Sequence, residues 1–217
     1  LYPEYTSSGY IMVLKHDSDG ISDEDMWKQL QKEYKDKYDM SWIGQYGFNN
    51  TYALIIREEA AKKYNLTKTS QLADVSDELV FGGNSDYIER KDGFHLLCDT
   101  YGLKFKDVKD IDIGLKYEAL KKGDIDVSNG FTTDAQLSND NVRVLEDDKH
   151  LQVNYFCSNV VRNDTLKSHP GLEEAIMKLD NSITDKEMAS LNYKVEVEGK
   201  EDVQVAKDYL TEKGIIK

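Results

Sequence analysis

The 217-residue chain contains only two cysteines and no long apolar run. Cys98 lies in a helical pattern and Cys157 in a strand-like one, and their spacing is not that of a metal site. Both are expected to be buried free thiols, with a disulfide as the alternative, so they do not fix the redox compartment. No stretch approaches the roughly 18 apolar residues of a transmembrane helix, so we expect no membrane span.

Motifs of the common enzyme classes are also missing. The sequence has no nucleophile elbow, no phosphate-binding glycine loop and no dinucleotide fingerprint. The four histidines are scattered, and none stands at i, i+4 or in a Cys/His cluster, so neither a metal site nor a cofactor is predicted. The polar run 146–150 could hold an acid–base pair, but a solvated turn after a strand is the favoured interpretation. Nothing in the sequence calls for an enzyme.

Basic residues are scarce relative to acidic ones. The chain has 28 Lys and Arg against 41 Asp and Glu, which gives a formal net charge of −13. A surface of this sign repels nucleic acid and anionic membranes, so we expect no nucleic-acid partner. Most of these charges are expected to form a solvated face.

Strand-like and helical segments alternate over short loops along most of the chain. The predicted strands are 41–43, 51–57, 79–83, 108–113, 125–127, 142–145 and 154–161, with a polar turn at 128–130. The predicted helices are one that begins after Ser22 or Asp23, then 58–64, one around 71–75, 94–101, 115–122, one opened by 131–134, 171–179, 185–191 and 203–213. This alternation is typical of an α/β fold with mostly parallel sheets. No internal repeat or low-complexity linker is visible, so any lobes must be divided by chain crossings.

Aromatic residues stand where α/β sheets place their ligands. Gly47-Phe48-Asn49-Asn50 interrupts two apolar runs, and Tyr52 opens the strand that follows. Tyr5, Phe131 and Tyr155 also lie near the ends of predicted elements. Each ring taken alone is more often a core or surface aromatic than a ligand contact, but several rings around one pocket would indicate a cationic ligand.

Several motifs together carry a family resemblance. They are residues 47–53 (GFNNTYA), 112–127, 144–150 (VLEDDKH), 160–166 (VVRNDTL) and the tail from 188 to 216. They resemble the substrate-binding proteins of the osmoprotectant ABC importers, which capture glycine betaine, carnitine, choline and related quaternary amines. The resemblance runs from Tyr5 to the C-terminus.

The resemblance implies a type II periplasmic-binding-protein-like fold of two α/β lobes joined by a two-strand hinge. We expect lobe 1 to comprise 1–45 and 156–217 and to lack its N-terminal unit, and lobe 2 to comprise 46–155. The implied protein is an extracytoplasmic receptor, either lipid-anchored or fused to its permease, on the bacterial cell membrane or in the periplasm. Its implied partners are the permease and, through it, the ATPase.

The resemblance also implies a ligand site. The aromatic cage would consist of Tyr5, Tyr52, Phe131 and Tyr155, and the polar end of the ligand would meet Ser8 and Asn50. Two segments depart from the family pattern: 129–134 reads NGFTTD where relatives read DAYSTD, and 153–159 replaces a Pro-Pro-Tyr-Tyr-Ala-Ala-Pro type segment. These departures leave room for a bulkier betaine such as ergothioneine. The alternatives are a receptor for another small polar solute, such as an amino acid, and the effector-sensing domain of a regulator.

Overall fold

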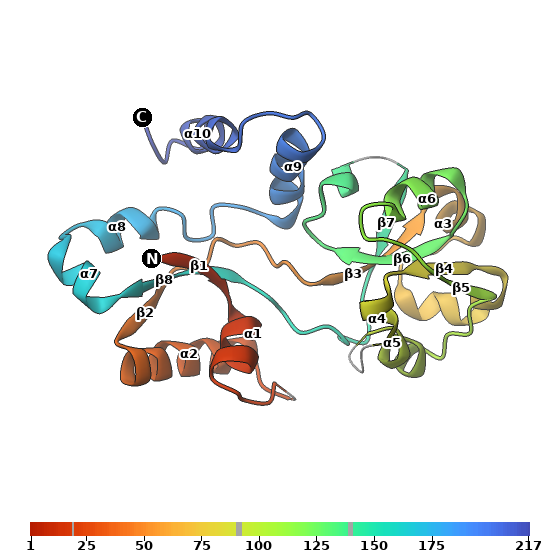
Figure 1. Ribbon diagram of the computed structural model, residues 1–217, viewed down its shortest axis with the longest axis horizontal. Helices are drawn as coiled ribbons and strands as arrows, with labels where there is room; N and C mark the ends of the chain where they lie inside the picture. The colour runs from red at the N-terminus through yellow and green to blue at the C-terminus, as the bar shows by residue number, and fades with distance from the viewer. Residues whose placement is uncertain (19, 90–92, 139–140) are drawn as a thin grey trace. The chain divides into compact units, whose positions relative to one another are not determined.

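The protein consists of two compact units (Figure 1). The computed structural model describes residues 1–18, 20–89, 93–138 and 141–217. Unit 1 comprises residues 1–51 and 153–217, and unit 2 comprises residues 52–152. The chain therefore passes between the units twice, at 51/52 and 152/153, whereas the sequence predicted lobe boundaries at 45/46 and 155/156.

Unit 1 is built on a three-stranded antiparallel sheet in the order β1-β8-β2. The strands are β1 (Tyr2–Tyr5), β2 (Met40–Ile43) and β8 (Cys157–Arg162). In the register Tyr5 lies opposite Cys157, so the start of the chain is fixed to a strand more than 150 residues further on. The central strand β8 is almost wholly buried, which is why its sequence is nearly continuous in small and apolar residues.

Helices cover both faces of the unit 1 sheet. Helix α2 (Asp23–Tyr38) begins at Ser22 as predicted, because the Ser22 hydroxyl accepts a hydrogen bond from the Asp25 N–H at 3.1 Å. It packs Leu30 and its neighbours against Trp42 of β2, while Ile176 lies in the cluster on the other side of the sheet. The remaining helical elements of unit 1 are α1 (Thr6–Ser8), a π-helical turn (Gly9–Val13), α7 (Asn163–Ser168), α8 (Leu172–Met177), α9 (Asp185–Glu196) and α10 (Asp202–Glu212).

Unit 2 is built on a five-stranded mixed sheet in the order β5-β4-β6-β3-β7. Its strands are β3 (Tyr52–Arg57), β4 (Val80–Gly83), β5 (Asp107–Asp110), β6 (Val127–Phe131) and β7 (Val142–Leu145). β4 pairs in parallel with β5 and β6, but β3 pairs antiparallel with β6 and β7. The expectation of mostly parallel sheets is therefore wrong. An α/β alternation in sequence does not exclude a strand that reverses direction within the sheet.

The alternating side chains of β3 are buried on both faces of the unit 2 sheet. Leu54 and Ile56 lie in the cluster that includes α3 and α5, whereas Ala53 and Ile55 pack with α6. The helical elements of unit 2 are α3 (Glu58–Tyr64), 3-10 turns at Thr69–Asp74, Ser76–Glu78 and Ala135–Ser138, α4 (Ser85–Glu89), α5 (Phe94–Tyr101) and α6 (Lys116–Lys122).

One predicted turn is a strand. Residues 128–130 were expected to turn because Ser-Asn-Gly favours turns, yet they lie inside β6, between β4 and β3. A Cβ on Gly130 would collide with the Ile55 side chain and come within 2.9 Å of Asp134 Oδ2. The glycine is thus required for close packing across the sheet rather than for a turn.

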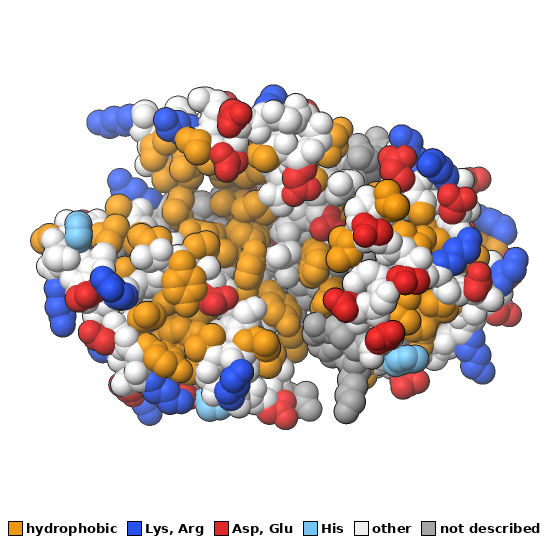
Figure 2. Space-filling model, viewed as in Figure 1, with side chains coloured by type: hydrophobic (Ala, Val, Ile, Leu, Met, Phe, Trp, Pro, Cys, Tyr) orange, Lys and Arg blue, Asp and Glu red, His pale blue; other side chains and the backbone are white. Residues whose placement is uncertain are grey.

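Charged side chains lie at the surface, as Figure 2 shows, with acidic and basic groups interspersed on the visible face. Among the described residues, Lys116 is the one charged residue that is buried, at 6% exposure. Both cysteines are free, as predicted, although only Cys157 is buried and Cys98 is half-buried. Burial raises the pKa of the Cys157 thiol to about 12. Within the described chain, no helix is both long enough and apolar enough to cross a bilayer.

Candidate ligand-binding site

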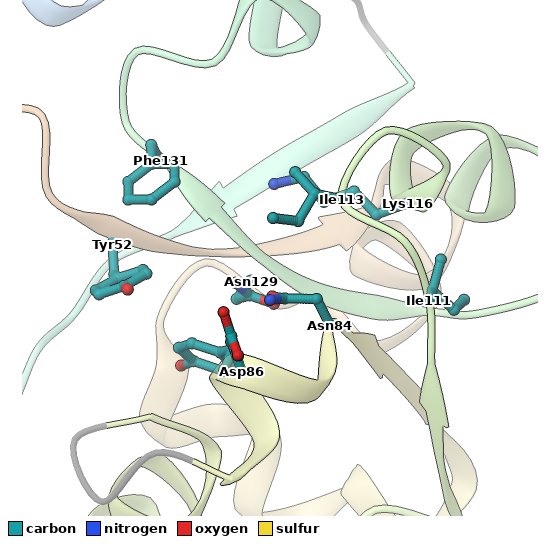
Figure 3. A pocket seen from close by; sticks show the side chains of 9 residues that line it. Tyr52, Asn84, Asp86, Ile111, Ile113, Lys116, Asn129 and Phe131 are labelled. Carbon is teal, nitrogen blue, oxygen red and sulfur yellow. The ribbon is translucent and has the colours of Figure 1, made fainter.

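Unit 2 contains a pocket of about 170 Å3 at the ends of β3 and β6 (Figure 3). It combines aromatic, aliphatic and polar side chains. The lining residues are Tyr52, Asn84, Asp86, Tyr87, Ile111, Ile113, Lys116, Asn129 and Phe131. Two of these, Tyr52 and Phe131, were predicted from the sequence to contact a ligand.

Strand pairing brings Tyr52 and Phe131 together. They lie directly opposite each other in the β3–β6 register, and their rings stack with centroids 5.0 Å apart and planes 25° apart. The Tyr87 ring lies 5.4 Å from that of Tyr52, so three aromatic side chains form one continuous cluster. Because Tyr52 and Phe131 are stacked on each other, a cation would contact the faces that they turn to the pocket and would not lie between them.

A single carboxylate oxygen fixes the Phe131 segment. Asp134 Oδ2 accepts hydrogen bonds from the Phe131 N–H at 3.1 Å and from the Tyr117 hydroxyl at 2.5 Å. The Lys116 ammonium lies 3.2 Å from the same oxygen and 6.0 Å from the centroid of the Phe131 ring. Asp134 therefore neutralises a buried ammonium and fixes the backbone that carries the ring.

In unit 1, Tyr5, Asn50 and Tyr155 lie close together. The Asn50 side-chain Nδ2 donates to the Tyr5 hydroxyl at 3.3 Å, and the Asn50 backbone N–H donates to the Tyr155 carbonyl at 3.0 Å. Burial raises the pKa of Tyr5, so this hydroxyl stays protonated and can act as a donor as well. Hydrogen bonds from Asn50 thus link three of the predicted site residues.

Asn49, which was not predicted to be a site residue, makes hydrogen bonds beside Asn50 and Tyr155. Its Nδ2 donates to Asn154 Oδ1 at 2.7 Å, and its Oδ1 accepts from the Tyr155 N–H at 2.7 Å. Its own N–H donates to Asp185 Oδ1 at 2.7 Å. One amide thereby fixes the backbone of Tyr155 and connects two segments that are a hundred residues apart in the chain. The sequence signal was present, because adjacent asparagines at a chain reversal often bond to the backbone.

The turn before these asparagines depends on Gly47. Its φ of 107° lies in the region that favours glycine, and a Cβ there would stand 2.8 Å from the Ile183 carbonyl oxygen. The segment is thus held closely against the region that precedes α9.

Ser8 is half-buried at the end of α1, next to two residues that support the fold. The Ser7 hydroxyl donates to the Asn154 carbonyl at 2.5 Å, and Thr6 Oγ1 accepts from the Phe156 N–H at 3.1 Å. α1 is therefore bound to the Asn154–Phe156 segment that also carries Tyr155.

The six predicted site residues fall into two sets. Tyr5, Ser8, Asn50 and Tyr155 belong to unit 1, and Tyr52 and Phe131 belong to unit 2. Hydrogen bonds link Tyr5, Asn50 and Tyr155 within unit 1, and ring stacking links Tyr52 and Phe131 within unit 2. The meeting of the two sets around one ligand stays a prediction. The pocket residues Asn84, Asp86, Tyr87, Lys116 and Asn129 were not predicted as ligand contacts, although Lys116 lies in the family motif 112–127 and Asn129 begins the altered motif 129–134.

The carboxylates of the 146–150 run support their own loop. Asp147 accepts hydrogen bonds from the Tyr101 hydroxyl and from the N–H groups of Leu151 and Gln152, the last two at 3.0 and 2.8 Å. Asp148 accepts from the hydroxyl of Ser70 at 2.6 Å. Within the described ranges, no three His, Cys, Asp or Glu side chains are placed to hold a metal ion.

A solved structure defines the class of fold. The crystal structure described as a glycine betaine/carnitine/choline ABC transporter superposes with a TM-score of 0.91 at 34% identity, over 98% of this chain and 78% of that one. Apo YehZ from Escherichia coli superposes with a TM-score of 0.82, over 99% of this chain and 80% of that one, and at 24% identity it supports the fold alone. The structural neighbours are periplasmic binding proteins of the type II fold, so the predicted fold class is confirmed.

Sequence relatives define the family. The family described as the substrate-binding domain of the ABC-type glycine betaine transport system matches residues 1–212. The ergothioneine transport permease/ergothioneine binding protein EgtU of Helicobacter pylori (strain G27) is 36% identical over 99% of this chain and 38% of its own length. The carnitine transport binding protein OpuCC of Listeria monocytogenes serotype 1/2a is 36% identical over 83% of this chain and 59% of its own length. The chain belongs to this family of ABC-transporter substrate-binding domains, and it spans less than two thirds of the length of these two relatives.

Proposed function

We propose that the chain is the solute-capturing domain of an ABC importer and that its ligand is a quaternary-ammonium compound. The stacked pair of Tyr52 and Phe131 on the wall of the unit 2 pocket carries this proposal. Each aromatic face against a desolvated cation contributes about 0.5–2 kcal/mol. A trimethylammonium group needs no hydrogen bonds, so rings stabilise it where a purely apolar wall would only remove it from water.

The full site would also use Tyr5 and Tyr155 as aromatic faces, with Ser8 and Asn50 at the polar end of the ligand. This requires residues of both units to meet on one molecule. The ligand would then favour the arrangement of the units in which both sets touch it, and binding would shift the population toward that arrangement. The permease would respond to the arrangement, and the ATPase would supply energy through the permease.

The proposed location is the extracytoplasmic face of the bacterial membrane or the periplasm, because the proteins of this family deliver solutes to membrane importers. The receptor would be anchored by lipid or fused to its permease. The name of the Helicobacter relative combines a permease with a binding protein, which favours the fusion.

Calorimetry with choline, glycine betaine, carnitine and ergothioneine tests the proposal. At least one is expected to bind more tightly than its analogue with a protonated dimethylammonium group, because that group loses a hydrogen bond to water when it enters the cage. Equal affinity for trimethylated and demethylated forms of every ligand would contradict a cation cage.

A further inference from the structure

Asn129 lines the unit 2 pocket, and its side-chain amide oxygen is buried beside β4 without a partner in the described part of the chain. Its side chain is 7% exposed, and its Oδ1 has no hydrogen-bond partner among the described residues. Such an oxygen has lost water without gaining a donor, which is unfavourable and uncommon in folded proteins. A ligand that brings an N–H or O–H to this point would remove that deficit.

The position of Asn129 relative to the aromatic pair suits such a ligand. Asn129 and Phe131 are two residues apart on β6, so their side chains share one face of the strand, with Cα atoms about 7 Å apart. Figure 3 shows Asn129 near the centre of the pocket view, with Phe131 and Tyr52 to its left. A molecule whose ammonium group contacts the rings therefore has its next polar atom within reach of Asn129.

The amide can turn toward a ligand. Its oxygen now stands over β4, where a Cβ on Gly83 would lie 3.0 Å from it. The terminal torsion of asparagine is broad rather than confined to narrow wells. Rotation about this bond can bring the oxygen to the pocket, which Asn129 already lines.

The charges around Asn129 favour a hydrogen-bond donor on the ligand over another hydrogen-bond acceptor. The Asp86 carboxylate lines the same pocket and accepts but does not donate hydrogen bonds when ionised. The Lys116 ammonium, which also lines this pocket, is already paired with Asp134 at 3.2 Å. A ligand carboxylate placed here would meet Asp86 and the unpaired oxygen, whereas a ligand O–H or N–H would satisfy them.

We propose that Asn129, together with Asp86, is a specificity determinant that selects quaternary-ammonium ligands carrying an O–H or N–H donor. The inference rests on the proposed function and narrows it. Hydroxylated amines and betaines with an N–H-bearing ring belong to the selected class. Glycine betaine, which has no donor besides its cationic group and carboxylate, is disfavoured.

Matched ligand pairs test the inference by isothermal titration calorimetry on the wild-type protein. Choline is compared with its O-methyl ether, and carnitine with γ-butyrobetaine, which lacks the hydroxyl. The donor-bearing member of at least one pair is expected to bind at least tenfold more tightly. Equal affinities within both pairs would overturn the inference, and so would a failure of choline, carnitine and ergothioneine alike to bind.

Variants of Asn129 test whether this residue causes the preference for ligands that carry a donor. Asn129→Leu keeps a similar volume but removes the oxygen, so the tenfold ratio should fall to about one. Asn129→Asp retains acceptors and should keep the preference. Ser128→Ala, one residue away on the buried opposite side of β6, is the matched control and should leave the ratio unchanged. Because each ratio is taken within one variant, loss of folded protein does not alter it.

The outcomes separate this inference from the proposed function. A preference that persists in Asn129→Leu would overturn the role of Asn129 while leaving the cation cage intact. If choline bound no more tightly than its uncharged carbon analogue 3,3-dimethylbutanol, the cage itself would fail.

Discussion

The two units fix their candidate ligand residues by different means. In unit 2, Tyr52 and Phe131 stand opposite each other on paired strands, and the sheet register decides their contact. In unit 1, Asn50 and Tyr155 lie outside the named strands, and side-chain amides such as that of Asn49 determine where they lie. The register of two paired strands is set by many backbone hydrogen bonds at once, whereas the hydrogen bonds of the Asn49 amide all depend on one side chain.

This difference predicts that the two halves of the site respond differently to mutation. Unit 1 should lose the placement of Asn50 and Tyr155 through single polar substitutions, whereas Tyr5 is also held by the β1–β8 register. In unit 2, most single polar substitutions should leave Tyr52 stacked on Phe131. Substitution of Asp134 is the exception, because three groups contact its carboxylate.

The largest effect is expected from Asp134→Ala in unit 2. The change leaves the Lys116 ammonium buried without its partner, which costs about 3 kcal/mol or more of unfolding free energy. Chemical denaturation should show the loss. Asp124→Ala, at an exposed carboxylate just after α6, is the control and should change stability by less than about 0.5 kcal/mol. Equal effects would mean that Asp134 does not anchor the unit.

The next effect is expected from Asn49→Ala in unit 1. Two short hydrogen bonds of the side chain are lost, and the Tyr155 N–H loses its acceptor, at a cost of about 1–3 kcal/mol. Asn50→Ala is the matched control in the neighbouring position. It should change stability less but weaken ligand binding, because its longer bond to Tyr5 contributes less to the fold. If the two variants were equally stable, the stabilising role assigned to the Asn49 side chain would be refuted.

Removal of single rings tests whether both units touch the ligand. Tyr52→Ala is expected to weaken binding of a quaternary amine at least tenfold, or about 1.4 kcal/mol, while Tyr52→Phe keeps the aromatic face and most of the affinity. Tyr5→Ala should weaken binding in the same direction. A wild-type affinity in Tyr5→Ala, measured by calorimetry, would confine the ligand to unit 2.

The smallest effect concerns acid stability in unit 1. Hydrogen bonds from Lys213 and Thr184 lower the pKa of Glu187 to about 2, from an ordinary value of 4.5. Since the folded state holds the lower pKa, this stabilisation is complete above about pH 4.5 and is lost as the pH falls toward 2. Because the Glu187 side chain is 32% exposed, solvent screening limits the effect to about 1 kcal/mol or less.

Glu187→Gln tests this contribution through urea denaturation at a series of pH values. The variant should lose stability less steeply than the wild type between pH 5 and pH 2. Parallel pH profiles would show that the Glu187–Lys213 pair, at 2.5 Å, adds nothing in solution.

Local sequence patterns predicted most helices and strands but not their pairing. α3 and α5 coincide with the predicted ranges, and Ser22, one of the two predicted caps, caps α2, because capping and apolar periodicity act within a few residues. The polar residues 128–130 were misread as a turn, since only their neighbours in the sheet make Gly130 a strand residue. The antiparallel course of β3 was missed for the same reason.

The residues of the candidate site also divide into those that the local sequence could predict and those that it could not. Tyr52 and Phe131 could be predicted as candidates because each lies in a segment that matches a family motif, although Phe131 closes β6 and does not open a helix as expected. Asn84, Asp86 and Lys116 could not, because nothing in their local sequence distinguishes a pocket wall from a solvated loop or helix.

The sequence by itself determined the family, most of the helices and strands and the identity of the aromatic residues. These properties follow from local propensity and from motifs read along the chain. Only the tertiary structure decided that Tyr52 stacks on Phe131, that Asp134 neutralises a buried Lys116 and that Asn129 has an unpaired oxygen. Each depends on residues distant in sequence whose contact and burial arise when the sheet forms, and hydrogen bonds and charges acquire their full energetic weight only once they are removed from water.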